Sequence, residues 1–555
     1  MRWIVRIVVA MLLLLLLGWA VLHWVILPRV DEFRPRLVEW ASGTLGAPVS
    51  IGRLHAESNG LVPSVSLHDV QVHDPTGRAG LRVRRVLASF SVLSLAGGGL
   101  EQLVIDQPEL EMRRTAQGRL LLGGIDLSGD ELGDTRAADW FFSQTEFLVR
   151  EGRVTWIDDK RQAAPVGLHE VQLVVRNGRR RHQIRLDATP EASWGERFTV
   201  IGQFRQPVFS RHPGYWREWD GQAYAEFRRV DVSQLRQYID LKADWGVDLL
   251  DGHGALRLWA GVRKGLPVEA TADLAVGRVE ARFGPDLAPL AFASVTGRLA
   301  WRDQGSGSEF DTRDLHFVDA DGLVWPGGNF TLNYRDGQGG GPVGGELRGD
   351  QLDLAALAKI ASRLPLPPKL HEQLKAHPVQ GLVERISARW DGPLDAPRDW
   401  QVGARLSRLA IGALAAPARA DGTPVEGVPG LSGATLDLQA GRAGGRANLS
   451  LREGALEFPG VFEEPRIPLA ELDLRANWQL QGEHITVNLD ELKLSNADLA
   501  GSFKARWHTT EPKLPGQARF PGVLDLQGSF SHGNGARVHR YLPLVIPAEA
   551  RHYVR

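Results

Sequence analysis

Residues 472–489 read LDLRANWQLQGEHITVNL, and the alternation in this stretch decides the fold class. Every second residue is apolar in 472–480 and again in 485–489, and the residues between them are polar or charged. Because successive side chains of a β-strand point to opposite faces, the stretch predicts two half-buried strands that each carry one apolar face. The residues expected on that face are Leu472, Leu474, Ala476, Trp478, Leu480, Ile485, Val487 and Leu489.

The same period of two occurs far from this stretch. Apolar residues alternate at Val171, Leu173 and Val175, and again at Ile184 after the dipeptide Asn177-Gly178, which is a typical tight-hairpin signal. The basic run 179–181 follows that turn, and we interpret it as the solvated shoulder of the hairpin rather than as a nucleic-acid patch. Glycine is frequent, with 62 residues in 555, as expected for many turns between short strands. A mainly β fold is therefore predicted.

Charge and cysteine content exclude several classes of function. The 65 Lys and Arg residues balance 66 Asp and Glu residues, so the chain has no global field that would attract nucleic acid. No cysteine is present, which excludes disulfides, thiolate nucleophiles and cysteine-ligated metal sites.

The amino-terminal region contains a predicted transmembrane helix. Residues 7–27 read IVVAMLLLLLLGWAVLHWVIL, which is long enough to cross a hydrocarbon core. A cleaved signal peptide is the alternative, but this apolar run is longer than the usual signal core and no small-residue cleavage site follows it. We therefore predict an uncleaved single-pass anchor, represented by Ile7, Leu12, Leu17, Trp24 and Leu27. The long body that follows is expected to be translocated.

Directly after the anchor, residues 29–47 predict a short amphipathic helix. Phe33, Leu37, Trp40 and Leu45 recur at near-helical spacing before Gly46.

A weak internal repeat organises the rest of the chain. Each copy pairs a helix-capping Asp or Asn with apolar residues four and seven positions later, and the copies are Asp231 with Leu235 and Tyr238, Asp353 with Leu357 and Ile360, and Asn534 with Val538 and Tyr541. Because the third copy is short, we expect the chain to be the amino-terminal portion of a longer protein. The predicted organisation is an anchor at 1–28, a connecting helix at 29–47, a first β-rich segment at 48–225, modules at 226–345 and 346–530, and the start of a third module at 531–555.

Signatures of catalysis are missing. The sequence lacks the phosphate-binding, esterase-type and zinc-protease motifs, and no nucleophile, base and orienting group can be proposed together. We therefore predict a protein that is not an enzyme and needs no cofactor.

The apolar strand faces must be covered by something. A second sheet, as in a β-sandwich, is one solution. A curled sheet whose trough holds a non-protein hydrophobe is the other, because helical cover is scarce in the sequence. Lipid chains are the expected filler, since each buried CH₂ group gains about 0.8 kcal/mol.

Three segments carry a family resemblance: 45–74 (LGAPVSIGRLHAESNGLVPSVSLHDVQVHD), 429–445 (PGLSGATLDLQAGRAGG) and 458–478 (FPGVFEEPRIPLAELDLRANW). Together with the anchor, they make the chain resemble the YhdP family of the AsmA-like group, which includes TamB. The resemblance implies an elongated, curled, antiparallel, chorein-like β groove with short interspersed helices.

In function, the resemblance implies a single-pass protein of the inner membrane of Gram-negative bacteria, with its bulk in the periplasm. The implied activity is bridge-like transfer of phospholipid between the inner and outer membranes. The expected partners are phospholipid acyl chains, the inner membrane and an outer-membrane or periplasmic protein, but no nucleic acid. The alternative is a scaffold or assembly factor for outer-membrane components, with a closed β-sandwich core.

Overall fold

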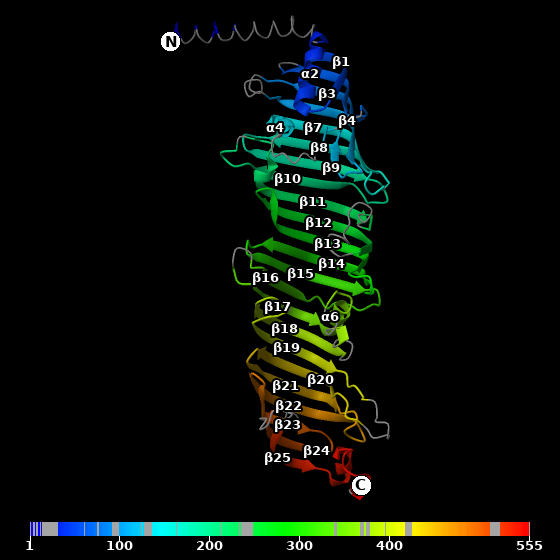
Figure 1. The fold of residues 1–555 in the computed structure, drawn as a ribbon, viewed down its shortest axis with the longest axis vertical. Coiled ribbons are helices and arrows are strands. Elements are labelled where there is room, and N and C mark those ends of the chain that lie inside the picture. Colours follow the sequence, from blue (N-terminus) through cyan, green and yellow to red (C-terminus); the bar gives the residue numbers. More distant parts are fainter. Residues whose placement is uncertain are drawn as a thin grey trace. The chain divides into compact units, whose positions relative to one another are not determined.

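The structure is a computed structural model. It describes residues 31–59, 62–74, 77–91, 99–123, 125–126, 136–162, 164–210, 212–231, 233–234, 248–337, 341–366, 371–372, 378–394, 396–416, 425–510 and 522–553, and residues 2, 3, 6, 9, 10 and 13. Strands dominate these residues, and the helices are few and short (Figure 1). The predicted mainly β class is confirmed.

The chain divides into two units, one formed by Met1–Trp245 with Asp251–Val276 and the other by Gly246–Leu250 with Gly277–Arg555. The boundaries of the repeat modules proposed from the sequence remain predictions. The first unit contains α2 (Arg34–Leu45), β1 (Val49–Asn59), β2 (Val62–His73), β3 (Ala79–Ser89), β4 (Gln102–Arg114), β5 (Leu120–Leu122), β6 (Ile125–Asp126), α4 (Arg136–Ser143), β7 (Glu146–Asp158), β8 (Val166–Asn177), β9 (Arg181–Pro190), β10 (Phe198–Arg205), η3 (Trp216–Glu218), β11 (Asp220–Asp231) and most of β12 (Asp248–Arg263).

Strand β13 (Leu266–Arg282) contains the point at which the chain passes into the second unit. The second unit continues with β14 (Leu290–Asp303), β15 (Gly307–Asp319), β16 (Asn329–Arg335), β17 (Gly344–Asp353), α6 (Leu354–Ala361), β18 (Val379–Asp391), β19 (Asp399–Ile411), β20 (Gly430–Gly441), β21 (Gly444–Glu457), β22 (Arg466–Gln481), β23 (His484–Ser495), β24 (Leu499–His508), β25 (Val523–Gly533), η6 (Gly535–Tyr541) and α8 (Ala548–Tyr553).

Strand pairing is a meander in both units, with one exception. From β14 to β25 each strand pairs antiparallel with the next. In the first unit β4 pairs in parallel with β7, so the predicted antiparallel pairing is wrong for these two strands. The connection from β4 to β7 contains β5, β6 and α4, which makes it long enough for the crossover that a parallel pair requires.

The hairpin between β8 and β9 exists, but its turn is shifted from the predicted position. Asn177 pairs with His182, and the amide of Gly178 donates to the carbonyl of Arg181 at 2.7 Å. The two central residues of the turn are therefore Arg179 and Arg180, and the prediction of a turn at Asn177-Gly178 is wrong. Asn177 stays in the strand because its side-chain amide donates to the carbonyl of Gln144 at 2.8 Å.

The predicted connecting helix is present as α2, which ends at Gly46 with a left-handed φ of 68°. Leu37 and Leu45 pack against the cluster of Ala47, Val49, Ile51 and Val72. Phe33 and Trp40 are exposed, so the predicted apolar face packs only in part.

None of the helices among the described residues has the length and hydrophobicity needed to cross a membrane. Ile7, Leu12, Leu17, Trp24 and Leu27 lie outside the described residues, and the anchor remains a prediction.

Two of the predicted helix caps are confirmed. Asp353 accepts a hydrogen bond from the Ala356 amide at 2.8 Å at the start of α6, and Asn534 accepts one from the Ala536 amide at 3.1 Å at the start of η6. Asp231 accepts from the Ser233 amide at 3.0 Å, but the residues after 234 in this copy lie outside the described residues.

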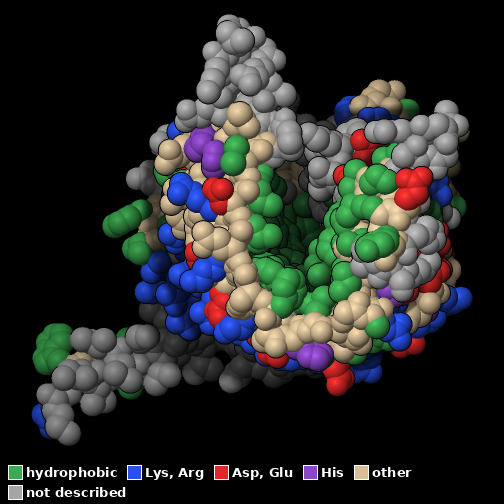
Figure 2. All heavy atoms as spheres, turned by 90° about the horizontal axis from the view of Figure 1, so that it is seen from below, with side chains coloured by type: hydrophobic (Ala, Val, Ile, Leu, Met, Phe, Trp, Pro, Cys, Tyr) green, Lys and Arg blue, Asp and Glu red, His purple; other side chains and the backbone are tan. Residues whose placement is uncertain are grey.

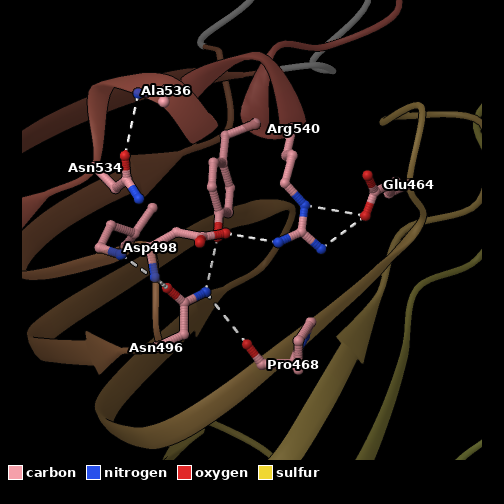
Figure 3. A network of polar contacts seen from close by, with 9 residues as sticks. Glu464, Pro468, Asn496, Asp498, Asn534, Ala536 and Arg540 are labelled. Carbon is pink, nitrogen blue, oxygen red and sulfur yellow. Dashed lines mark hydrogen bonds and ion pairs between the residues drawn. The ribbon is translucent and has the colours of Figure 1, made fainter.

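A polar network fixes η6 against the sheet (Figure 3). Arg540 donates to Glu464 at 2.7 Å and to Asp498 at 2.7 Å, and Tyr541 donates its hydroxyl to Asp498 at 3.0 Å. The Asn496 amide in turn donates to the Tyr541 hydroxyl at 2.9 Å. The hydrogen bond to Glu464 is the main reason why the pKa of Arg540 lies above its ordinary value.

Many strands contain a bulge at a polar residue. In β19, Leu406 pairs with Leu436 and Leu409 pairs with Ala434, so a register shift keeps both leucines on one face although they are three residues apart. Arg408, within the bulge, has a φ of 52°. Strand residues with similar positive φ are Asp69, Gln107, Glu151, Glu170, Arg278, Asp314, Gln351 and Glu453. Of these residues, Glu151, Glu170, Asp314 and Glu453 also lie at register shifts. Because a bulge bends its strand and increases the local twist, the bulges at these residues and at Arg408 curl the sheet.

Candidate functional site

The eight residues predicted to share an apolar face do so. Leu480 pairs with Ile485, Trp478 with Val487, and Ala476 with Leu489 in the β22–β23 hairpin. Residues that pair directly in an antiparallel ladder lie on the same face of the sheet. Leu472 is 5% exposed, whereas the other seven are half-buried.

The apolar face extends beyond the predicted residues. A register shift after Arg475 lets Leu474 pair with Leu492 and Leu472 with Leu494. A strict period of two would place Leu492 and Leu494 on the opposite face, so their part in the site was missed. The signal that could have found them is the polar pair at 490–491 between two leucines, which also occurs at 407–408.

The apolar face forms unbroken rows across the second unit. The first, called the Trp478 row, follows direct pairing from β17 to β25 and consists of Leu347, Ala388, Val402, Ala440, Gly445, Trp478, Val487, Trp507 and Leu524. The Ala476 row consists of Gly349, Ile386, Ala404, Leu438, Ala447, Ala476, Leu489, Ala505 and Leu526. At about 4.8 Å per strand, each row is roughly 38 Å long.

Two further rows complete the face. The Leu474 row contains Leu352, Val383, Leu406, Leu436, Leu449, Leu474, Leu492, Phe503 and Gly528, and the Leu472 row contains Leu409, Ala434, Leu451, Leu472, Leu494, Gly501 and Phe530. All four rows consist of apolar residues and glycine.

Protein covers these rows unequally. Leu409, Ala434, Leu451 and Leu472 are buried in one core cluster, so the Leu472 row is closed from β19 to β22, whereas Phe530 at its β25 end is 66% exposed. Most side chains of the other three rows are only half-buried, and on β25 Leu524 is 59% exposed. A facing sheet would have buried these side chains fully, so the rows form an apolar groove that is open over most of the described part of this unit.

Figure 2 shows this arrangement from the carboxy-terminal end of the chain. Hydrophobic side chains line a hollow, and charged side chains lie on the outer surface. On that outer surface, Arg405 of β19 bridges Glu384 at 2.9 Å and Asp437 at 3.4 Å. Glu491 bonds to Lys493, and this hydrogen bond lowers the pKa of Glu491. The outer face is therefore ionic and wet, which fixes the apolar face as the inner one.

The first unit has a corresponding apolar row, called the Leu173 row. It follows direct pairing from β1 to β12 and consists of Leu54, Leu67, Val86, Ile105, Val149, Leu173, Leu186, Val200, Ala225 and Leu258. Leu54 is buried, and the other members are half-buried. Helix α4 covers part of the same face, because Trp140, Phe141 and Phe142 pack on the cluster around Phe147.

Short helix α6 covers one part of the face in the second unit. Its Ala356 is buried with Phe317, Trp325, Leu352 and Val383. Lys359 of α6 forms ion pairs with Asp319 and Asp321. Burial acts to raise the pKa of Asp319, but the hydrogen bonds from Lys359 and the backbone outweigh it, so the pKa is lowered and Asp319 holds α6 in place as a carboxylate.

Within the described residues, no group of three or more His, Asp and Glu side chains is placed to hold a metal ion. What the site offers is a continuous apolar surface without charged side chains in its rows, where the indole N–H groups of Trp478 and Trp507 are the hydrogen-bonding side-chain groups. Such a surface can remove hydrocarbon from water.

The comparisons with known proteins identify one relationship. A family model described as YhdP protein matches residues 1–555. No curated protein and no solved structure matches the chain.

Proposed function

Because this chain belongs to the YhdP family, we propose that it is a lipid-transfer protein that carries phospholipid acyl chains between the inner and outer membranes. In this proposal, residues 7–27 anchor the chain in the inner membrane, and the β-rich body lies in the periplasm. The protein has no catalytic role and needs no cofactor. An outer-membrane or periplasmic protein is the proposed receiver of the lipid.

One observation carries the proposal: apolar rows run from strand to strand through each unit, and most of their side chains are only half-buried. Leaving so much apolar surface in water is unfavourable, at about 25 cal/mol per Å². Acyl chains resting on the rows would remove this cost.

The length and chemistry of the rows suit an acyl chain. One bilayer leaflet has a hydrocarbon thickness of about 15 Å, which is less than half of the roughly 38 Å of the Trp478 row. A chain of about sixteen carbons gains roughly 12 kcal/mol by staying out of water. Because the rows are continuous, an acyl chain can slide along them and keep most of this favourable free energy.

A charge-insertion experiment tests the proposal. We expect Leu474→Asp combined with Val487→Asp to abolish co-purifying phospholipid, because two carboxylates would then lie on the acyl-chain surface. The matched control is Gln479→Asp combined with Asn488→Asp, which adds the same charges to the outer face of the same two strands. Mass spectrometry of extracted lipid provides the measurement.

Lipid retained at wild-type levels by a folded inner-face variant would contradict the groove. A wild-type protein that carries no lipid would favour the scaffold alternative.

A further inference from the structure

Three arginine side chains at one turn of the first unit have no carboxylate partner in the described part of the chain. Arg179, Arg181 and Arg205 are exposed, and together with Gly178 and Arg180 they line a cavity of about 430 Å³. This concentration of positive charge is local, since the net charge of the chain is −1.

The backbone forces these charges together. Arg181 at the start of β9 pairs directly with Arg205 at the end of β10, and both lie on the outer face. Arg180, in the turn, donates its guanidinium to the carbonyl of Gln206 at 3.2 Å, which ties the turn to the end of β10. Like charges that lie directly opposite each other in a sheet are destabilising.

Three other arginines on the outer face near this turn are arranged differently, because each has an acidic neighbour. These pairs are Arg176 with Glu146 at 2.8 Å, Arg185 with Asp187 at 2.8 Å, and Arg197 with Glu170 at 3.4 Å. The charges of these three arginines are therefore neutralised by carboxylates of the same chain, whereas those of Arg179, Arg181 and Arg205 are not. A group that supplies negative charge from outside the chain would compensate the repulsion.

We propose that Arg179, Arg181 and Arg205 bind a phosphate group, carried either by the headgroup of an anionic phospholipid or by a soluble phosphate. The planar guanidinium matches phosphate oxygens with two parallel hydrogen bonds, and several arginines around one cavity can share the group. No carboxylate lines the cavity of Arg179, Arg181 and Arg205, and the nearby Glu146 is paired with Arg176, so a net negative headgroup is favoured over one that also carries an ammonium.

The position of the turn suits a headgroup. It joins β8 and β9, whose inner faces contribute the half-buried pair Leu173 and Leu186 to the Leu173 row, whereas Val175, nearer the turn, is buried beside α4. A lipid whose chains lie on that row would expose its headgroup to water at the strand ends. This lipid source rests on the proposed function, whereas the phosphate site itself does not.

Titration calorimetry of the purified full chain tests the site, with inorganic phosphate and dihexanoyl phosphatidylglycerol as separate probes. Arg181→Gln combined with Arg205→Gln should weaken binding about tenfold or more, because charge-assisted bonds are lost. The control, Arg176→Gln combined with Arg185→Gln, removes two charges from the same face and should bind as the wild type does. Tighter binding of the lipid probe assigns the site to a headgroup, and equal binding assigns it to soluble phosphate.

Binding of both probes at wild-type strength by Arg181→Gln/Arg205→Gln would overturn the proposal. Should that variant fail to fold, Arg179→Gln at the tip of the turn should still weaken binding severalfold, and unchanged binding would again overturn it. Lipid extraction from the wild-type protein separates this test from that of the proposed function. If the arginine variants lose phosphate binding but the wild-type protein carries no acyl chains, the result supports the phosphate site and contradicts lipid transfer.

Discussion

Individual glycines keep the groove surface flat where a tryptophan crosses to the neighbouring strand. A Cβ atom on Gly445 would overlap the indole of Trp478, and one on Gly345 would overlap the indole of Trp390. Each indole therefore lies across a glycine of the adjacent strand. This arrangement buries aromatic surface without filling the groove.

We predict that Gly445→Ala destabilises the second unit by about 1–3 kcal/mol, because the added methyl group would overlap both the Trp478 indole and the backbone carbonyl oxygen of Gln439. Guanidinium-induced unfolding followed by tryptophan fluorescence measures the effect. Gly403→Ala is the control, since its Cβ would lie 3.3 Å from the Ser387 hydroxyl, which can rotate away. Equal stability of the two variants would show that the indole does not depend on the glycine.

In the first unit, His182 is a buried titratable group. It is 1% exposed and stacks on Trp219 with ring centroids 4.2 Å apart, and its Nδ1 lies 2.8 Å from Oδ1 of Asn177. Burial lowers the pKa of His182 from its ordinary value of 6.5. The folded protein therefore binds this proton less readily than the unfolded chain does.

The sign of the pH effect follows from that difference. Well above pH 6.5 the imidazole is neutral in both states and stability is unaffected, whereas stability falls as the pH drops through 6.5 toward the lower pKa of the folded state. We predict that thermal unfolding monitored by circular dichroism shows this loss between pH 7 and pH 5. His182→Gln should reduce the loss, and an identical pH profile in that variant would exclude His182 as the cause.

Among the elements, the bulged strands explain why the period of two succeeds in one place and fails in another. From Leu472 to Leu480 the strand is regular, so the inner face could be predicted directly. In β23, β19 and β21 a bulge at polar residues shifts the alternation of inward and outward side chains by one residue. A prediction that assumes strict alternation therefore places the leucines after the bulge on the wrong face. Only the pairing partner reveals the shift.

Arg408 provides a test of the bulges. A β-branched residue is strongly disfavoured at its φ of 52°, whereas glycine is tolerated there. We predict that Arg408→Val destabilises the second unit by about 1–2 kcal/mol, and that Arg408→Gly changes stability by less than about 1 kcal/mol. Urea unfolding of the three proteins checks this. A valine variant as stable as the glycine variant would mean that the bulge does not require the left-handed conformation.

Connections were harder to predict than strands. The Asn177-Gly178 dipeptide marked the β8–β9 hairpin, but the hydrogen bond from Asn177 to the Gln144 carbonyl joins segments 33 residues apart and moves the turn. The parallel pairing of β4 with β7 likewise depends on a crossover whose path is not encoded in any local pattern. Long-range contacts of this kind cannot be predicted from the spacing of residues alone.

For the whole molecule, the meaningful property is that each unit repeats one design: an ionic outer face, an apolar inner face and short helices that cover part of it. The apolar character of the inner face could be predicted, because every second residue of each regular strand is apolar. Its openness could not, since that depends on the half-buried state of residues such as Leu438 and Val487. The same openness makes these residues the right places to look for bound lipid.

Site-specific photo-crosslinking in cells tests the groove most directly. Benzoylphenylalanine placed at Leu438 or Val487 should form phospholipid adducts, because both side chains lie in open inner rows. The same probe at Gln439 or Thr486, one residue away on the outer face, should form none. Adducts that are absent from the inner positions, or equally frequent at the outer ones, would contradict a lipid-carrying groove.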